Sequence, residues 1–94
     1  MKNKQKAAHI LIVDDDRSIR QILQKAFEKE GLECSAASGG EQALAIMQTK
    51  KFDVIITDLR MPGLGGIDLL KQINARYDAD VMVMAGYSDD FTFE

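Results

Sequence analysis

Short runs of apolar residues alternate along the chain with longer segments in which apolar residues recur every three or four positions. Three of the runs are apolar at almost every position, which is typical of strands buried on both faces of a parallel sheet. A fourth run alternates apolar and polar residues more mildly, which suits an edge strand. The pattern predicts strands at His9–Val13, at 32–37 as the edge strand, at 53–57 and at 81–84.

Three helices are predicted between these strands, each with one apolar stripe. Asp16 is the predicted N-cap of the first helix and Gly31 its C-terminal stop. The second helix is predicted to start at a capping box formed by Ser38 and Glu41, and the third to run to about Arg76. The stripes comprise Ile19, Ile22, Leu23, Ala26 and Phe27, then Ala43, Leu44, Ile46 and Met47, and finally Ile67, Leu70 and Ile73. The alternation of strands and helices predicts an α/β fold with a parallel sheet.

Composition narrows the class of protein. With 94 residues the chain can form one domain and not two. No apolar run approaches the roughly 18 residues that a membrane span needs, so no membrane contact is expected. The single cysteine, Cys34, excludes an internal disulfide and a cysteine-based zinc site, and we expect a cytoplasmic protein. The net charge of −3 does not indicate nucleic-acid binding, and residues 1–8 are expected to form a flexible basic tail.

Acidic residues stand where two of the predicted strands end. Asp14 and Asp15 follow the first strand, and Asp58 follows the third. If the strand order is 2-1-3-4, the chain reverses direction between strands one and three, where ligands bind in open parallel sheets. The three carboxylates would converge there, and a hard divalent cation such as Mg²⁺ would suit them. An acidic residue in such a place can also simply cap a helix, the role we assign to Asp16.

These motifs resemble the receiver domains of two-component response regulators. The resemblance rests on the apolar run and acids of residues 10–16, on the strand leading to Asp58, and on D-x-x-M-P-x-x-x-G from Asp58 to Gly66. It implies a flavodoxin-like three-layer fold of order 2-1-3-4. It also implies that Asp58 is the phosphoacceptor and that a histidine kinase or phosphotransfer protein is the partner.

The resemblance further implies a set of Mg²⁺ ligands. Asp15 would bind the ion directly and Asp14 through a water molecule. Asp58 and the backbone carbonyl of Arg60 would complete the protein's share of the ligands. On this interpretation the protein is a signalling module and not an enzyme.

Two departures from the family pattern stand out. Ala85 occupies the position of a Thr or Ser whose hydroxyl binds the phosphoryl group, and the fifth strand with its Lys and the fifth helix are missing from the sequence. We therefore expect residues 9–94 to form a partial receiver domain in which phosphorylation is impaired. The sheet should also be uncovered over strands three and four, at Val54 or Ile55 and at 81–84, which favours self-association as a dimer.

The same residues also bear on other functions that place an acid after a strand. A haloacid-dehalogenase-like phosphatase needs a second acid two residues after its nucleophile, and Arg60 stands there. A P-loop NTPase needs G-x-x-x-x-G-K-[ST], which the sequence lacks. A receiver that is not phosphorylated and serves as an assembly scaffold remains open. Arg17 and Arg20 are expected to be solvated, although one could lean toward the acidic residues.

Overall fold

The computed structural model describes residues 8–84. Ala85, the residues beyond it and all but the last residue of the expected 1–8 tail lie outside these described residues, so the expectations placed on them stay predictions. The described elements are β1 (His9–Val13), α1 (Arg17–Lys29), β2 (Glu33–Ala37), α2 (Gly40–Met47), β3 (Val54–Asp58), α3 (Gly66–Arg76) and β4 (Asp80–Met84). The predicted alternation of strands and helices is confirmed, with bounds that shift by one or two residues.

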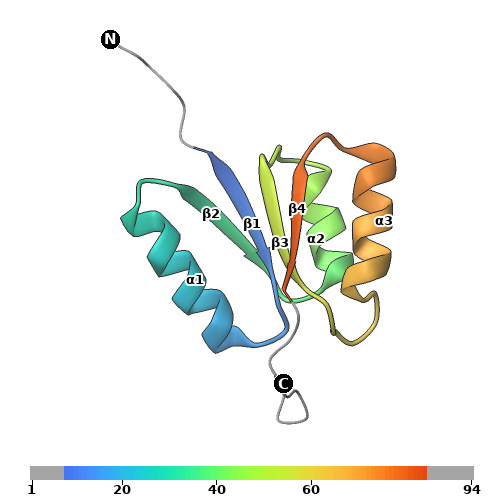
Figure 1. Cartoon of the computed structure of the whole chain (residues 1–94), viewed down its shortest axis with the longest axis horizontal. Coiled ribbons are helices and arrows are strands. Elements are labelled where there is room, and N and C mark those ends of the chain that lie inside the picture. Colours follow the sequence, from blue (N-terminus) through green and yellow to red (C-terminus); the bar gives the residue numbers. More distant parts are fainter. Residues whose placement is uncertain (1–7, 85–94) are drawn as a thin grey trace, which may run out of the picture.

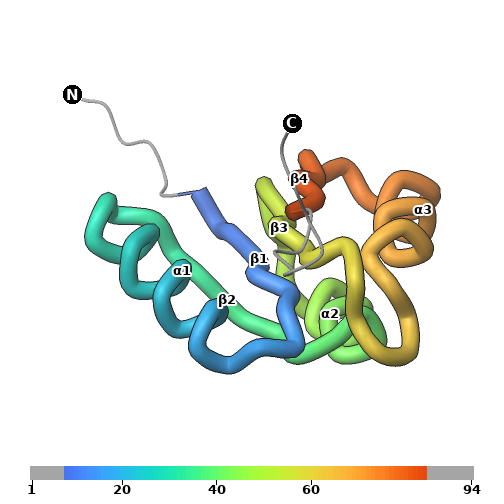
Figure 2. The backbone as a smooth tube through the Cα atoms, turned by 60° about the horizontal axis from the view of Figure 1, so that its bottom comes forward, coloured from blue at the N-terminus to red at the C-terminus, as the bar shows by residue number. Residues whose placement is uncertain are grey.

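The four described strands form one parallel sheet in the order β2-β1-β3-β4. Helix α1 lies on one face of this sheet, and α2 and α3 lie on the other (Figures 1 and 2). Right-handed crossovers impose this division, because the chain first moves outward to β2 and then back past β1 to β3 and β4. The result is the expected flavodoxin-like arrangement, in which the loops after β1 and β3 lie at the same end of the sheet (Figure 1).

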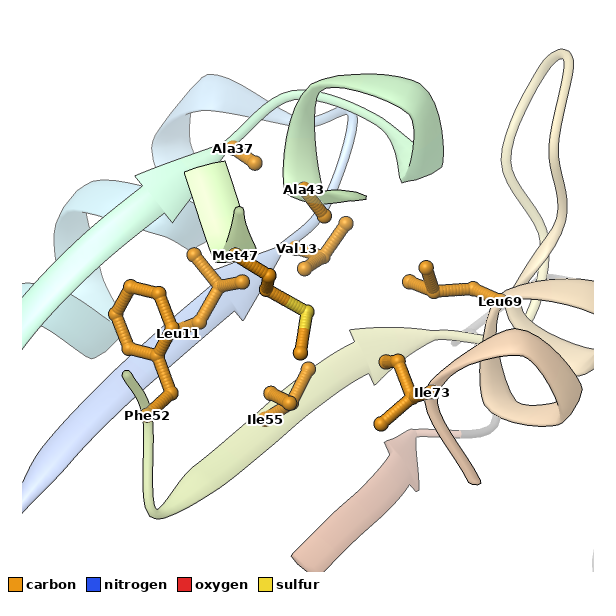
Figure 3. Packing of buried hydrophobic residues seen from close by; sticks show 9 residues of the cluster. All are labelled: Leu11, Val13, Ala37, Ala43, Met47, Phe52, Ile55, Leu69 and Ile73. Carbon is orange, nitrogen blue, oxygen red and sulfur yellow. The ribbon is translucent and has the colours of Figure 1, made fainter. Parts of the chain in front are cut away.

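The main core fills the space between the sheet and helices α2 and α3 (Figure 3). Leu11 and Ile55 from the sheet and Leu69 and Ile73 from α3 are all 0% exposed. Burying one such side chain contributes roughly 1.5–3 kcal/mol relative to leaving it in water. The other members of the cluster are Val13, Ala37, Ala43, Met47 and Phe52. This core fixes β1 and β3 side by side.

A smaller core lies on the α1 face of the sheet. Its buried members are Ile10, Ile12 and Ile56, against which Leu23 and Phe27 of α1 pack. None of the residues of α1 is fully buried. The expected stripe is therefore only partly correct, since Ile22 is 63% exposed and Ala26 is also exposed.

The ends of α1 follow the sequence prediction. The Asp16 carboxylate accepts hydrogen bonds from the backbone N–H groups of Ser18 at 2.8 Å and Ile19 at 3.4 Å. Gly31 follows the helix with a φ of 85°, the left-handed conformation that favours glycine. Both expected helix signals are confirmed.

The predicted capping box of α2 is wrong. Its N-cap is Gly39, which makes no side-chain cap hydrogen bond. The N–H and hydroxyl of Ser38 both donate to Oε1 of Gln42, at 2.6 and 3.1 Å. The carboxylate of Glu41 turns instead toward Gly63 in the β3–α3 loop. A tertiary contact thus replaces the local one that the motif indicated.

The predicted core face of α3 also needs correction. Ile67 is 48% exposed, whereas Leu69 and Ile73 are fully buried. The latter two are four residues apart and share the face that meets the sheet. Leu70 is half-buried beside them.

The expectation about an uncovered sheet is met only in part. Ile55 is 0% exposed in the main core, so the alternative that named it is wrong, and Val54 packs against the smaller core. Val81 packs against the main core, and Met84 against the smaller one. In this strand Met82 is 59% exposed and Val83 is 36% exposed, so the uncovered part of the predicted surface lies at these two residues.

His9 joins three segments at the opposite end of the sheet from the acidic residues. Its backbone N–H donates to Oδ2 of Asp53 at 2.8 Å, and its Nδ1 lies 3.3 Å from the carbonyl oxygen of Lys51. Its Nε2 contacts the carboxylate of Glu33, its register partner on β2. Both ring contacts are to oxygen acceptors, so only the protonated ring can donate to both. The hydrogen bond to Glu33, followed by that to Lys51, raises the pKa of His9 above its usual 6.5.

Replacing His9 by Gln is expected to remove a pH-dependent part of the stability. A raised pKa in the folded state contributes stability that is fully present below about pH 6.5 and is lost as the pH rises through the folded pKa. The difference in free energy of unfolding between the wild type and His9→Gln should therefore shrink from pH 5.5 to pH 8.5. Urea unfolding at the two pH values measures it. Glu30→Gln, an exposed acid outside this contact, is the control, and a difference independent of pH would contradict the assignment.

Candidate phosphoacceptor and metal site

Two adjacent strands bring the acidic residues together. Val13 of β1 pairs in register with Thr57 of β3. The residues that follow, Asp14 and Asp58, therefore stand next to each other where the two strands end. Both strands are anchored by apolar side chains on both faces, so the position of the acids is set by the core and not by the acids themselves.

The carboxylates of Asp14, Asp15 and Asp58 form one cluster. Each offers an oxygen, and these oxygens all lie within 4.8 Å of one another. Asp14 is only 5% exposed, Asp58 is half-buried and Asp15 is exposed. The expected convergence of the three residues is thus found, and their exposure to solvent increases from Asp14 through Asp58 to Asp15.

Asp14 carries the electrostatic cost of this arrangement. Burial, and then the negative charges of Asp58, Asp15 and Asp16, raise the pKa of its carboxyl above the usual value. A hydrogen bond from the backbone N–H of Asp16 to Oδ1, at 2.8 Å, acts in the opposite direction. The surroundings of Asp14 therefore disfavour its ionised carboxylate, and a bound cation would offset this effect.

The β3–α3 loop shapes the surroundings of Asp58. The N–H of Arg60 donates to Oδ1 of Asp58 at 3.4 Å, which places the Arg60 peptide beside this carboxylate. A Cβ at Gly66 would lie 2.3 Å from the Asp58 carbonyl oxygen, so no other residue fits without moving the Asp58 backbone. The sequence indicates this contact only through the spacing of Asp58 and Gly66 in the D-x-x-M-P-x-x-x-G motif.

The donor set fits a hard divalent cation. All three side chains supply carboxylate oxygens, the ligands that Mg²⁺ takes in proteins, and the exposed side of the cluster leaves room for water. The contact of the Arg60 N–H with Asp58 says nothing of the Arg60 carbonyl, which stays a predicted ligand.

Comparison with known proteins agrees with this geometry. The family model of the response regulator receiver domain matches residues 10–94. The DNA-binding transcriptional regulator NtrC of Salmonella typhimurium is 42% identical over 81 residues, which is 85% of this chain and 17% of that protein.

Solved structures of response regulators are similar to this chain in fold and sequence. The response regulator TrrA of Thermotoga maritima, solved in complex with Mg²⁺-BeF, has a TM-score of 0.79 at 34% identity, covering 86% of this chain and 71% of that one. The beryllofluoride-activated NtrC receiver domain has a TM-score of 0.76 at 40% identity, covering 90% and 69%.

The chain belongs to the family of response regulator receiver domains, the signalling modules of two-component systems. It spans about a sixth of the length of the NtrC proteins that it matches (17%). Among the described residues, no helix is long and apolar enough to cross a bilayer.

Replacing Asp58 by Asn is expected to stabilise the metal-free protein at pH 7. The substitution removes one charge from a cluster in which two like charges about 5 Å apart repel by roughly 1–3 kcal/mol. Thermal unfolding in EDTA, compared with Asp78→Asn at an exposed loop acid, measures the gain. An Asp58→Asn protein no more stable than the wild type would contradict the repulsion argued here.

Proposed function

We propose that this receiver domain, residues 9–94, accepts a phosphoryl group on Asp58 from the phosphohistidine of a histidine kinase or phosphotransfer protein. The observation that carries the proposal is the clustering of three carboxylates within 4.8 Å at the end of β1 and β3. Three ionised carboxylates this close repel one another, and partial burial increases that repulsion. Such a cluster is therefore expected where a bound cation offsets the repulsion. Family membership supports the same role.

The chemistry is a transfer between two nucleophiles. An oxygen of Asp58 attacks phosphorus, the O–P bond of an acyl phosphate forms, and the P–N bond to the donor histidine breaks, with its electron pair returning to the imidazole. Asp58 suits this because it is half-buried, so one side stays open to a partner, while the Arg60 N–H orients its Oδ1. The obstacle is the repulsion between an anionic nucleophile and an anionic phosphoryl group.

Mg²⁺ is the proposed cofactor. When bound, it supplies positive charge that offsets this repulsion. Following the resemblance to the family, we assign Asp15 as a direct ligand and Asp14 as a ligand through water; both carboxylates lie in the cluster with Asp58. Asp58 and the Arg60 carbonyl complete the set. The similar protein TrrA was solved in complex with Mg²⁺-BeF, which supports Mg²⁺ as the cofactor.

We further propose that phosphorylation of this chain is slow. The sequence has Ala85 where the family pattern has Thr or Ser. Alanine cannot donate a hydrogen bond to the transferred group. One preorganised donor of this kind is worth on the order of 10²–10³ in rate.

The test is labelling of the purified chain with acetyl phosphate. We expect slow incorporation at Asp58 that requires Mg²⁺ and stops in EDTA, and a marked acceleration in Ala85→Thr. Intact-mass spectrometry over time, with Asp58→Asn as the negative control, measures both.

The outcomes separate the two claims. Labelling that persists in Asp58→Asn would refute the acceptor assignment. Rapid, stoichiometric labelling of the wild type at Asp58, unchanged by Ala85→Thr, would keep the acceptor and refute the proposed impairment.

A second proposed property is self-association, which would also serve a scaffold that is not phosphorylated. Within the described residues β4 pairs only with β3, and Met82 is 59% exposed. Met82 shares its register position with Ile56, so it faces the α1 side of the sheet. A two-fold contact between copies would cover this apolar surface.

Sedimentation equilibrium at micromolar concentration is expected to show a dimer for the wild type and a monomer for Met82→Lys. Ile67→Lys is the matched control, because Ile67 is equally apolar and 48% exposed but lies on α3 at the other face. A wild type that stays monomeric into the high micromolar range, or equal disruption by the control, would refute this surface.

A further inference from the structure

The guanidinium of Arg20 reaches from the first turn of α1 to the backbone beneath the acidic cluster. Its Nη1 donates a hydrogen bond of 2.7 Å to the carbonyl oxygen of Asp14. The contact is partly buried and involves a charged donor, which makes it stronger than a neutral hydrogen bond. No carboxylate of the cluster receives a hydrogen bond or ion pair from Arg20 among the described residues.

The carbonyl that Arg20 holds belongs to the peptide that links Asp14 to Asp15. Because a peptide is planar, fixing this oxygen also fixes the direction of the Asp15 N–H and the positions of both α-carbons. The other side of Asp14 is fixed as well, since its N–H donates to the Ala37 carbonyl oxygen at 3.1 Å.

The two acids differ in how they are otherwise held. Oδ1 of Asp14 accepts from the Asp16 N–H. Within residues 8–84 the exposed carboxylate of Asp15 accepts no hydrogen bond. The position of the Asp15 α-carbon, from which this side chain extends, therefore matters most, and the Arg20 guanidinium bonds the carbonyl of the peptide that leads to it.

We propose that Arg20 is a positioning residue for the cation site: it holds the Asp14–Asp15 peptide so that both carboxylates face Asp58. The inference rests on the proposed Mg²⁺ site and adds a residue to it. Arg20 thus acts through the backbone and itself occupies no carboxylate oxygen of the cluster.

Removing Arg20 has opposite effects on cation binding under two possible roles of this residue. If Arg20 acted only as a nearby positive charge, removing it would strengthen the binding of a divalent cation. If Arg20 positions the ligands, removing it weakens binding, as loss of a residue that orients metal ligands does, by roughly tenfold or more. The sign of the change in affinity therefore distinguishes the two roles.

The experiment is a Mn²⁺ titration of the full chain followed by paramagnetic broadening in NMR spectra. We expect Arg20→Gln to weaken Mn²⁺ binding by roughly tenfold. Arg20→Lys, which keeps the charge but not the planar fork, should fall between Arg20→Gln and the wild type. Arg17→Gln is the matched control: it removes the same charge from the same helix turn at an exposed residue, and should bind at least as tightly as the wild type.

A second readout in the absence of metal separates this inference from the metal site itself. Arg20→Gln, but not Arg17→Gln, should shift the Asp15 amide resonance and speed hydrogen exchange at the Asp14 N–H. If the wild type shows no broadening near Asp14, Asp15 and Asp58, the metal site fails and this readout alone decides the anchoring role. Binding in Arg20→Gln as tight as in the wild type, or unchanged amides at Asp14 and Asp15, would refute the inference. If Arg20→Gln does not fold, Arg20→Lys decides by the same criteria.

Discussion

The mutual repulsion of three carboxylates at the end of β1 and β3 is the constraint on which this structure depends. Asp14 is 5% exposed and lies with Asp15 and Asp58 in a cluster less than 5 Å across. Such a cluster does not form by itself, because each ionised group raises the cost of ionising the next. The free energy that holds it comes from elsewhere, chiefly from the apolar layers on both faces of β1 and β3.

The layers do this because the central strands are buried on both sides. Leu11 and Ile55 face α2 and α3, whereas Ile12 and Ile56 face α1. Moving either strand along its axis would disturb both layers, so the ends of the strands are fixed in register. The acids then inherit their positions from the strands that precede them. The core is thus what makes a repulsive site geometrically definite.

Two arginines donate hydrogen bonds at the site, and neither side chain bonds a carboxylate of the cluster. The guanidinium of Arg20 donates to the Asp14 backbone carbonyl. The backbone N–H of Arg60 donates to one carboxylate oxygen of Asp58. The close approach of Gly66 to the Asp58 carbonyl holds the adjoining loop in place. Backbone contacts therefore shape the site, and the three carboxylates still each offer an oxygen within 4.8 Å of the others.

The sequence by itself determined the order of elements, the parallel sheet and the acids at its carboxyl end, because strand and helix periods and the residues after each strand are local properties. Tertiary structure decided what depends on a neighbour distant in sequence. Ser38 bonds Gln42 and Glu41 lies against Gly63, so the two do not form a capping box. In α3, packing on the sheet buries Leu69 and leaves Ile67 exposed. Tertiary structure also selected Arg20 over Arg17 for the contact with Asp14, since only the folded helix shows which arginine faces the turn that follows β1.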